Sequence, residues 1–306
     1  TVVVSAFAKI NLGLHVLRKR ADGFHDLETV FLRVGWADRM TFEMDGASGS
    51  AEDSLTSAVT IEASDGVDAV GLVSMTCSDP SLPTDERNLC VRAVRLLADR
   101  TGLVNPPRLR IHLDKRVPHG AGLGGGSSDA ATCLREAARL WQLEVADEDL
   151  MDLAADLGSD VPFFFGEATA FGSGRGEILD GIPFPAALQD RWIAVVVPDF
   201  GISTAEAYGG IAPNDADRPD LTRLMVEGDL TDWKKDLVND FERHLFVAYP
   251  ALAELKSHLY ARGAGYAAMS GSGSAIFGIF DSEEGARRAV EGTGMRYWMG
   301  PAQAAL

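Results

Sequence analysis

Alternation of apolar and other residues predicts several strands along the chain. Residues 2–14 and 109–113 carry apolar side chains at about every second position, a period that fits a strand with one buried face, and residues 27–34 are also strand-like. Residues 192–198 form a continuous apolar run, which we interpret as a buried strand, and residues 275–280 predict another. The expected strands are therefore spread over the whole chain.

Apolar residues at helical spacing predict helices between these strands. One helix is expected from the N-cap Asn88 to about residue 99, and another follows residue 128 and includes Leu134, Ala137 and Trp141. Further helices are expected at residues 147–158, 205–208, 237–246 and 250–262, the first of them ending at the C-cap Gly158. From residue 237 the order helix, helix, strand, strand, helix, strand suits a ferredoxin-like α+β domain.

A glycine-rich loop joins the strand at residues 109–113 to the helix after residue 128. Residues 118–128 read PHGAGLGGGSS, with five glycines in eleven positions. Glycine accepts positive φ and allows close approach to the backbone, so consecutive N–H groups can point into one concavity at the positive end of the helix dipole. The loop therefore predicts an anion site, most naturally for phosphate.

Two common phosphate motifs fit this loop less well. Gly120, Gly122 and Gly125 match the dinucleotide pattern G-x-G-x-x-G, but the acidic residue expected about 20 positions later should end a second strand. The segment 144–149 leads into another helix instead. A P-loop requires Lys directly after the last glycine, whereas Ser127 and Ser128 follow here. A purely structural turn is the remaining alternative, and the length of the run disfavours it.

Composition narrows the function classes. The 306 residues suffice for one large or two moderate domains, and 28 Lys and Arg against 45 Asp and Glu give a formal net charge of −17. Such a surface repels nucleic acid and anionic membrane, so an anionic ligand needs a strong local site. The three cysteines, Cys77, Cys90 and Cys133, have no C-x-x-C spacing and are expected to be buried thiols.

The chain contains no apolar run of the length that a membrane span requires. Lys9 and Asn11 interrupt the first apolar segment, which is therefore unlike a signal peptide. We expect a cytoplasmic protein. The chain begins at Thr1 rather than Met, which leaves open whether residues precede it.

The glycine-rich loop resembles the ATP loop of the GHMP kinases, the superfamily of galactokinase, homoserine kinase, mevalonate kinase and phosphomevalonate kinase. Further stretches resemble the branch of that superfamily that phosphorylates 4-diphosphocytidyl-2-C-methylerythritol, in the methylerythritol phosphate route to isoprenoids. They lie at residues 8–12, 20–25, 88–89, 157–163, 201–204 and 270–273, and together they extend over nearly the whole chain.

This resemblance implies a two-domain α+β GHMP kinase fold. Residues 1–168 would form an ATP-binding domain like domain 2 of ribosomal protein S5, and residues 169–306 the ferredoxin-like C-terminal domain. The implied reaction is transfer of phosphate from ATP to the 2-hydroxyl of the cytidine diphosphate sugar alcohol. Mg²⁺, a hard cation with oxygen ligands, would bridge the phosphates, with Ser128 as its protein ligand.

Two residues are the expected catalytic pair. Lys9 lies in an apolar strand, where an unpaired charge is costly, so it is either an edge lysine that reaches solvent or a stabiliser of the acceptor oxygen. Asp160 follows a helix end and precedes three phenylalanines. It is either a turn former or the general base that accepts the hydroxyl proton, for which kinases ordinarily use Asp.

The resemblance also implies the binding residues. Phe24 and Tyr208 would stack on the two faces of the cytosine and His25 would hydrogen-bond its edge, although Tyr is commoner in the family at the position of Phe24. Asn11 and Thr204 would face the same acceptor. Asn88 and Lys115 would lie beside the adenine, although locally they are interpreted as an N-cap and a surface lysine. The expected ATP loop consists of Pro118, His119, Gly120, Ala121, Gly122, Leu123, Gly124, Gly125, Gly126, Ser127 and Ser128.

Other stretches are less informative. Residues 45–71 predict a loop-rich hairpin without catalytic residues, and the acidic, proline-containing residues 212–219 predict a mobile loop. The glycine cluster at 263–274 is either a third superfamily motif near the phosphates or a plain hairpin turn.

Two other functions remain open alternatives. One is a mevalonate- or homoserine-type kinase, which Phe24, His25 and Tyr208 disfavour because a small aliphatic acceptor has no base to stack. The other is a nucleotide-binding regulator without turnover, which the presence of both Lys9 and Asp160 disfavours. The sequence leaves open whether the protein is a monomer or a homodimer.

Overall fold

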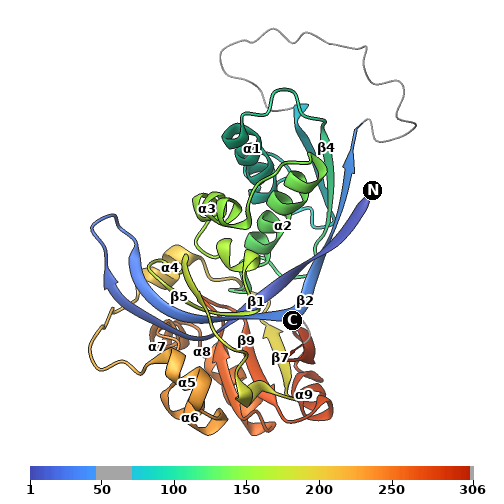
Figure 1. Ribbon diagram of the computed structural model, residues 1–306. Helices are drawn as coiled ribbons and strands as arrows, with labels where there is room; N and C mark the ends of the chain where they lie inside the picture. Colours follow the sequence, from blue (N-terminus) through green and yellow to red (C-terminus); the bar gives the residue numbers. More distant parts are fainter. Residues whose placement is uncertain (46–70, 304–306) are drawn as a thin grey trace.

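A computed structural model describes residues 1–45 and 71–303. The molecule contains two sheets, and the long hairpin of β1 (Val2–Lys19) and β2 (His25–Met44), which belongs to the first sheet, runs across its middle and contacts the second (Figure 1). The hairpin expected at residues 45–71 falls, except for its two end residues, outside the described part of the chain. None of the helices in that part is long and apolar enough to cross a membrane.

The first sheet has six strands in the order β3-β4-β2-β5-β6, with β1 paired to β2. All neighbours are antiparallel except β3 and β4. Its strands are β1 (Val2–Lys19), β2 (His25–Met44), β3 (Val73–Cys77), β4 (Leu109–Asp114), β5 (Thr169–Ser173) and β6 (Ile178–Gly181). The strands predicted near residues 2–14, 27–34 and 109–113 are confirmed, and the first two are longer than the predicted segments because each continues into the hairpin.

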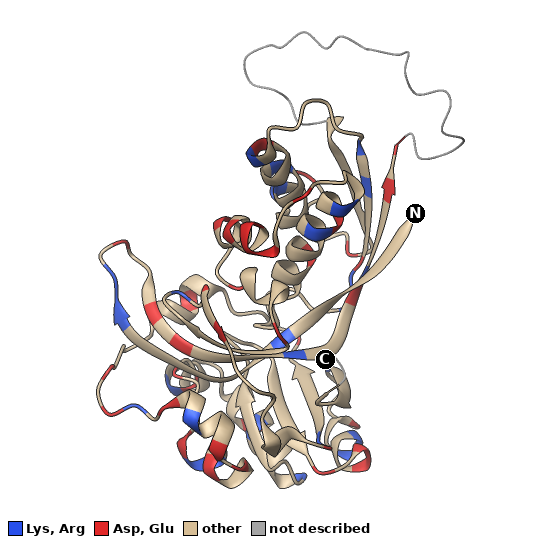
Figure 2. Cartoon of the chain, in the orientation of Figure 1, with Lys and Arg blue, Asp and Glu red and all other residues tan. Residues whose placement is uncertain are grey.

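Three helices cover one face of this sheet: α1 (Leu89–Thr101), α2 (Gly125–Leu140) and α3 (Asp147–Leu157). Their apolar faces pack with β2 and β4 in one core that includes Leu97, Leu134 and Phe42. Asn88 caps α1 by accepting a hydrogen bond from Cys90 N, as predicted. Acidic residues gather on the outer helix α3, whose first three residues are all acidic (Figure 2).

The second sheet is antiparallel, with the order β10-β7-β9-β8. Its strands are β7 (Trp192–Val197), β8 (Tyr266–Met269), β9 (Ile276–Phe280) and β10 (Arg296–Pro301). Helices α8 (Pro250–Ala261) and α9 (Glu283–Val290) pack against it, which gives the ferredoxin-like arrangement that the element order predicted. The remaining elements are η2 (Pro162–Phe165), η3 (Ala186–Leu188), α4 (Thr204–Gly209), α5 (Leu221–Glu227), α6 (Leu230–Asp236) and α7 (Glu242–Ala248).

The helix expected at residues 237–246 begins later, at Glu242. Asn239 holds the preceding segment extended: its side chain donates to Met269 O and Gly271 O and accepts from Phe241 N. Leu14 N also donates to Val238 O, so this segment lies along β1. Long-range hydrogen bonds therefore override the helical spacing of the apolar residues.

The predicted domain boundary after residue 168 lies among the elements of the first sheet. Strands β5 and β6, which follow residue 168, extend the first sheet through β2, so that sheet continues to Gly181. The chain reaches the second sheet only at Trp192. Two of the three cysteines, Cys90 and Cys133, are buried as expected, whereas Cys77 is half-buried, and all three are free thiols.

A buried cluster of three charges lies beneath the glycine-rich loop. Lys115 Nζ is 2.5 Å from Asp38 Oδ2 and 2.8 Å from Asp129 Oδ2, and all three side chains are at most 3% exposed. Asp38 also accepts hydrogen bonds from the backbone N–H groups of Arg116 and Val117. The cluster therefore joins β2, the segment before the loop and the helix after it.

One carboxylate of this cluster has too few partners. The Asp129 Oδ1 atom is buried without a hydrogen-bond partner in the described part of the chain. Burial raises the pKa of Asp129 to about 7, and nearby Asp38 adds to the effect while Lys115 opposes it. The pKa is thus higher in the folded than in the unfolded chain, so the folded state binds more protons and is destabilised as the pH rises from about 4 to about 7.

We predict that Asp129→Asn flattens this pH dependence. In the unaltered protein the Asp129 contribution to the unfolding free energy should fall with a slope of up to about 1.4 kcal/mol per pH unit across that window, and the variant should lose this slope. Denaturant unfolding from pH 5 to pH 8 measures it, with Asp156→Asn at an exposed ion pair as the control. Parallel curves for the unaltered protein and Asp129→Asn would contradict the assignment.

Candidate active site

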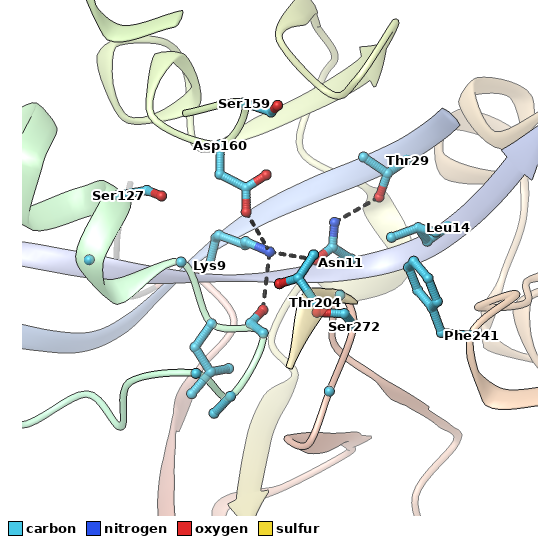
Figure 3. A pocket seen from close by; sticks show the side chains of 18 of the residues that line it. Lys9, Asn11, Leu14, Thr29, Ser127, Ser159, Asp160, Thr204, Phe241 and Ser272 are labelled. Carbon is cyan, nitrogen blue, oxygen red and sulfur yellow. Dashed lines mark hydrogen bonds and ion pairs between the residues drawn. The ribbon is translucent and has the colours of Figure 1, made fainter. Parts of the chain in front are cut away.

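A cavity of about 720 Å³ lies where the two halves of the molecule meet. Strands β1 and β2, the glycine-rich loop, the turn before η2, the β5–β6 turn, α4 and the β8–β9 turn all contribute to its lining. Figure 3 shows the cavity around Lys9. Of the expected site residues, the cavity brings together Lys9, Asn11, Phe24, His25, Pro118, His119, Gly120, Ala121, Gly122, Leu123, Gly124, Gly125, Gly126, Ser127, Asp160, Thr204 and Tyr208.

Lys9 is buried at the centre of this site, with 2% of its surface exposed. Its Nζ atom donates to Asn11 Oδ1 at 2.7 Å and to Gly122 O at 3.0 Å, and it lies 3.2 Å from Asp160 Oδ2 (Figure 3). An ammonium group has three donor hydrogens, so these three contacts satisfy it. The interpretation of Lys9 as an edge lysine that reaches solvent is therefore wrong.

Asn11 is fixed in turn by its neighbours. Its side-chain Nδ2 donates to Thr29 Oγ1, and the Thr29 hydroxyl donates to Gly13 O. Lys9 and Asn11 share a face of β1 because residues two apart in a strand point the same way. The local sequence of β1 and β2 thus aims both polar groups into the cavity (Figure 3).

Asp160 approaches Lys9 from the turn between α3 and η2. Its side chain is 36% exposed, so one carboxylate can contact both Lys9 and a bound molecule. The following Pro162 opens the short helix η2, and Phe163 behind it is fully buried. A carboxylate beside a buried ammonium, on the wall of a cavity, can accept a proton from a hydroxyl group that approaches its exposed side.

The glycine-rich loop presents its backbone to the cavity. Gly120, Gly122 and Gly124 all have positive φ, between 66° and 76°. Gly124 is the N-cap of α2, and Ser128 N is the first amide to bond back, to Gly124 O. The three preceding N–H groups, of residues 125–127, have no acceptor in the described part of the chain. Such N–H groups at a helix N-terminus can bind an anion, so the geometry of the loop is compatible with the predicted anion site.

The β8–β9 turn packs tightly against this loop. Ser270 Oγ and Lys9 Nζ both donate to Gly122 O, and Ala275 N donates to Ala121 O. A Cβ atom on Gly122 would lie 2.0 Å from Ser270 O. Because β8 and β9 are antiparallel, the turn is a hairpin connection. It also lines the cavity through Gly271, Ser272 and Gly273.

Aromatic side chains line the other end of the cavity. The His25 and Tyr208 rings stack at 4.8 Å, and Tyr208 packs edge-on against Phe241. Burial and the nearby Asp160 carboxylate raise the pKa of Tyr208 to about 12, while burial and the nearby Lys19 lower that of His25. Both rings are thus uncharged at neutral pH. Phe24 is 53% exposed, so its ring is available for stacking.

The His25–Tyr208 stack limits where a base can bind. A centroid separation of 4.8 Å leaves no room for another ring between these two side chains.

Thr204 is the first residue of α4 and lines the cavity, whereas the N-cap is Ser203, whose Oγ accepts from Glu206 N. Thr204 is therefore not the N-cap of α4.

Three expected ATP-side residues do not line the cavity: Asn88, Lys115 and Ser128. Asn88 is the cap of α1, and its neighbour Leu89 reaches the cavity instead. Lys115 is buried between Asp38 and Asp129, so its interpretation as a surface lysine is wrong.

Ser128 is 2% exposed, whereas Ser127 lines the cavity. Consecutive helical residues point about 100° apart, and α2 turns Ser127 outward and Ser128 into the core. The residues described by the structure contain no group of three His, Cys, Asp or Glu side chains that could hold a metal ion.

Sequence reasoning missed several lining residues. Arg175 lies in the turn between β5 and β6, and Thr29, Phe241 and Ser272 line the cavity from β2, the start of α7 and the β8–β9 turn. Gly174 and Gly176, on either side of Arg175, both have positive φ. That Gly-Arg-Gly triplet is the one local signal that could have found Arg175.

Comparison with known proteins places these features in a family. The model for the GHMP kinases N terminal domain matches residues 88–167, and that for the GHMP kinases C terminal domain matches residues 221–292. Solved structures of a homoserine kinase from Cytophaga hutchinsonii and of a mevalonate kinase have TM-scores of 0.62 and 0.66, at 16% and 12% identity. At that identity the likeness shows the fold alone.

Other relatives are much more similar. The 4-diphosphocytidyl-2-C-methyl-D-erythritol kinase of Salinibacter ruber is 42% identical over 93% of this chain and 92% of its own length. That of Chlorobium phaeobacteroides is 41% identical over 94% and 92%. A crystal structure of 4-(cytidine 5'-diphospho)-2C-methyl-D-erythritol kinase has a TM-score of 0.75 at 32% identity and covers 98% of both chains. The chain therefore belongs to the 4-diphosphocytidyl-2-C-methyl-D-erythritol kinase family of the GHMP kinases.

Proposed function

We propose that this protein transfers the γ-phosphoryl group of ATP to the 2-hydroxyl of 4-diphosphocytidyl-2-C-methyl-D-erythritol, as a step of the methylerythritol phosphate route to isoprenoids. One observation carries the proposal. The Lys9–Asp160 pair, with Nζ and Oδ2 3.2 Å apart, lies between the anion-binding loop and the aromatic end of one cavity. A donor phosphate and an acceptor hydroxyl can therefore meet at this pair.

The proposed chemistry follows from the positions of the two groups. Asp160 accepts the proton of the acceptor hydroxyl, the acceptor oxygen forms a bond to the γ-phosphorus, and the bond from that phosphorus to the β–γ bridging oxygen of ATP breaks to release ADP. Lys9 lies beside Asp160 and stabilises negative charge on the acceptor oxygen. Phosphoryl transfer depends mainly on positioning and charge stabilisation, so this small set of side chains suffices.

ATP phosphates fit the glycine-rich loop. The free N–H groups at the start of α2 and the positive end of its dipole favour an anion there. Gly120, Gly122 and Gly124 have positive φ, which favours glycine, so no side chain at these positions occupies that space. Mg²⁺ commonly takes most of its ligands from phosphates and water. The Ser127 hydroxyl lines the cavity and would be its protein ligand in place of Ser128.

We propose that Asn88 and Lys115 act on the adenine side indirectly. They hold neighbouring segments in place and do not contact the base. Asn88 fixes the start of α1, whose Leu89 reaches the cavity. Lys115 holds the segment before the loop in the buried charge cluster.

The cytidine of the acceptor fits the aromatic end. Phe24 offers an exposed ring, and the neutral His25 ring has two edge nitrogens that can bond to a base. Tyr208 supports His25 by stacking on it, and a base between Phe24 and Tyr208 requires the His25 ring to move. Thr204 and Asn11 line the path from this end to Lys9.

Removal of the proposed base tests the chemistry. Asp160→Asn keeps the shape of the side chain but removes the proton acceptor, so kcat should fall by roughly 10²–10⁴ while ATP affinity is nearly kept. Lys9→Met should also lower kcat. Steady-state kinetics with ATP titration measures both effects, and a thermal melt checks that each variant is folded. Wild-type turnover in both variants would remove Lys9 and Asp160 from the mechanism.

Gly124 offers a test of the loop with a matched control. Gly124 and Gly102 have φ of 67° and 65°, but a Cβ atom on Gly124 would lie 2.9 Å from Lys9 Cγ, whereas one on Gly102 would meet nothing within 4 Å. Alanine at either position should cost stability by about 1–2 kcal/mol, from backbone strain. Only Gly124→Ala should lower kcat/KM, because it displaces Lys9. Equal activity of the two variants would contradict this role of Gly124.

A panel of acceptors tests the substrate. Phosphate transfer from ATP should be efficient to 4-diphosphocytidyl-2-C-methyl-D-erythritol and poor to the sugar alcohol phosphate without cytidine, to mevalonate and to homoserine. Tyr208→Ala should lower kcat/KM for the cytidine compound by about 5- to 150-fold, the range expected for loss of one stacking ring, and leave ATP affinity unchanged. Tyr297→Ala on the exposed strand β10 is the control. Efficient transfer to mevalonate or homoserine, and not to the cytidine compound, would contradict the proposed substrate and leave only the assignment to the kinase fold.

A further inference from the structure

The turn between β5 and β6 places a single arginine on the wall of the cavity. Gly174 and Gly176 flank Arg175, with φ of 68° and 107°, conformations that side chains other than glycine rarely adopt. The turn is anchored on β2, because Leu27 N donates to Gly174 O at 2.8 Å. The backbone beside Arg175 is therefore tied to β2.

This turn lies directly beside the proposed general base. A Cβ atom on Gly176 would be 4.0 Å from Asp160 Oδ1 and 3.6 Å from Phe31 Cζ. The Arg175 guanidinium extends the other way and lies over the Phe24 ring, 5.0 Å from its centroid. Arg175 thus spans the interval between the reacting end of the cavity, at Asp160, and the aromatic end, at Phe24.

The guanidinium group is oriented but not fully bonded. Arg175 Nε donates to Glu177 Oε1 at 3.0 Å, which fixes the plane of the group. Its two terminal nitrogens have no hydrogen-bond partner among the described residues, and 30% of the side chain is exposed. A planar group with free parallel donors is suited to phosphate oxygens, which it can contact with two hydrogen bonds.

Charge singles out the same residue. Lys9 and Arg175 are the only lysine and arginine among the described residues that line the cavity. The three Lys9 donors are taken by Asn11, Gly122 and Asp160, whereas Arg18 and Arg20 at the hairpin tip are paired with Asp26 and Asp22 outside the cavity. Arg175 is also ion-paired, with Glu177, but through Nε alone, so among the described lining residues its terminal nitrogens are the cationic donors that remain for an anionic group on the acceptor.

We propose that Arg175 binds the diphosphate of the acceptor, and that it thereby selects a nucleoside diphosphate derivative over an uncharged nucleoside or sugar alcohol. This inference rests on the proposed function. In the acceptor the diphosphate links the cytidine to the sugar alcohol that carries the reacting hydroxyl. With the base at Phe24 and the hydroxyl at Asp160, the diphosphate passes the terminal nitrogens of Arg175.

Binding of CDP and of cytidine separates the diphosphate contact from the base contact. Calorimetric titrations use the full chain saturated with a non-hydrolysable ATP analogue, so that both probes report on the acceptor site. Arg175→Gln should weaken CDP binding by about 10- to 100-fold, the range expected for loss of charge-assisted hydrogen bonds, and leave cytidine binding unchanged. Arg175→Lys should recover part of the CDP affinity, because it restores the charge without the planar fork.

Steady-state kinetics and a control variant at Arg20 complete the experiment. Arg175→Gln should raise KM for the cytidine compound by a similar factor and leave KM for ATP unchanged. Arg20→Gln, at the hairpin tip near the cavity, controls for general attraction of anions and should match the unaltered protein in every measurement. An equal loss of CDP affinity in Arg20→Gln would show that positive charge near the cavity attracts CDP without a direct contact to Arg175. That result would overturn the inference.

The remaining outcomes distinguish the two proposals. Unchanged CDP affinity in Arg175→Gln, in a protein that phosphorylates the cytidine compound, would overturn only the role of Arg175. Equal weakening of CDP and cytidine would also overturn it, since Arg175 would then act by holding Phe24. If the unaltered protein binds neither probe and does not phosphorylate the cytidine compound, the proposed function fails and this inference fails with it.

Discussion

A buried ammonium group sets the geometry of this site. Lys9 is a charged residue on a strand in the middle of an apolar core, and burial of an unpaired charge would be prohibitive. Its three donors therefore require three acceptors in fixed positions, from β1, from the glycine-rich loop and from the turn before η2. Displacing any one of these segments leaves a buried donor unsatisfied, so the charge holds them together.

The same requirement joins the two halves of the molecule. Gly122 O accepts from Lys9 of the first sheet and from Ser270 of the turn in the second sheet, and the Asn11 backbone N–H also donates to Ser270 Oγ. These contacts need backbones closer together than a Cβ atom permits, since one on Gly122 would clash with Ser270 O. The glycine at this position thus serves the contact between the halves as well as the loop conformation.

The parts of the fold that are local in sequence could be predicted, and those that depend on distant partners could not. Strand periodicity, the Asn88 cap and the glycine-rich turn into α2 each follow from neighbouring residues. The position of Lys115 does not, because Asp38, which buries it, lies 77 residues away. The late start of α7 depends in the same way on Asn239 and its bonds to the β8–β9 turn.

Within the site, sequence located the segments better than the individual side chains. The loop was found, but only the start of α2 at Gly125 decides that Ser127 faces the cavity and Ser128 does not. Arg175 shows the opposite case, since its flanking glycines were visible in the sequence but their meaning required the position of Asp160. A turn becomes informative only when the residue across the cavity is known.

The proposed function requires so acidic a chain to bind two polyanions, and the charge distribution bears on how it could. The formal net charge is −17, so phosphate groups approach against a repulsive field. Within the cavity, however, Asp160 is the only acidic side chain among the described lining residues, and it faces Lys9. Many of the acidic residues lie instead on outer elements such as α3, whose first turn holds Asp147, Glu148 and Asp149 (Figure 2). Backbone N–H groups without an acceptor line one part of the cavity, and the Arg175 guanidinium, paired with Glu177 through Nε alone, lines another, so the cavity wall is much less acidic than the chain as a whole.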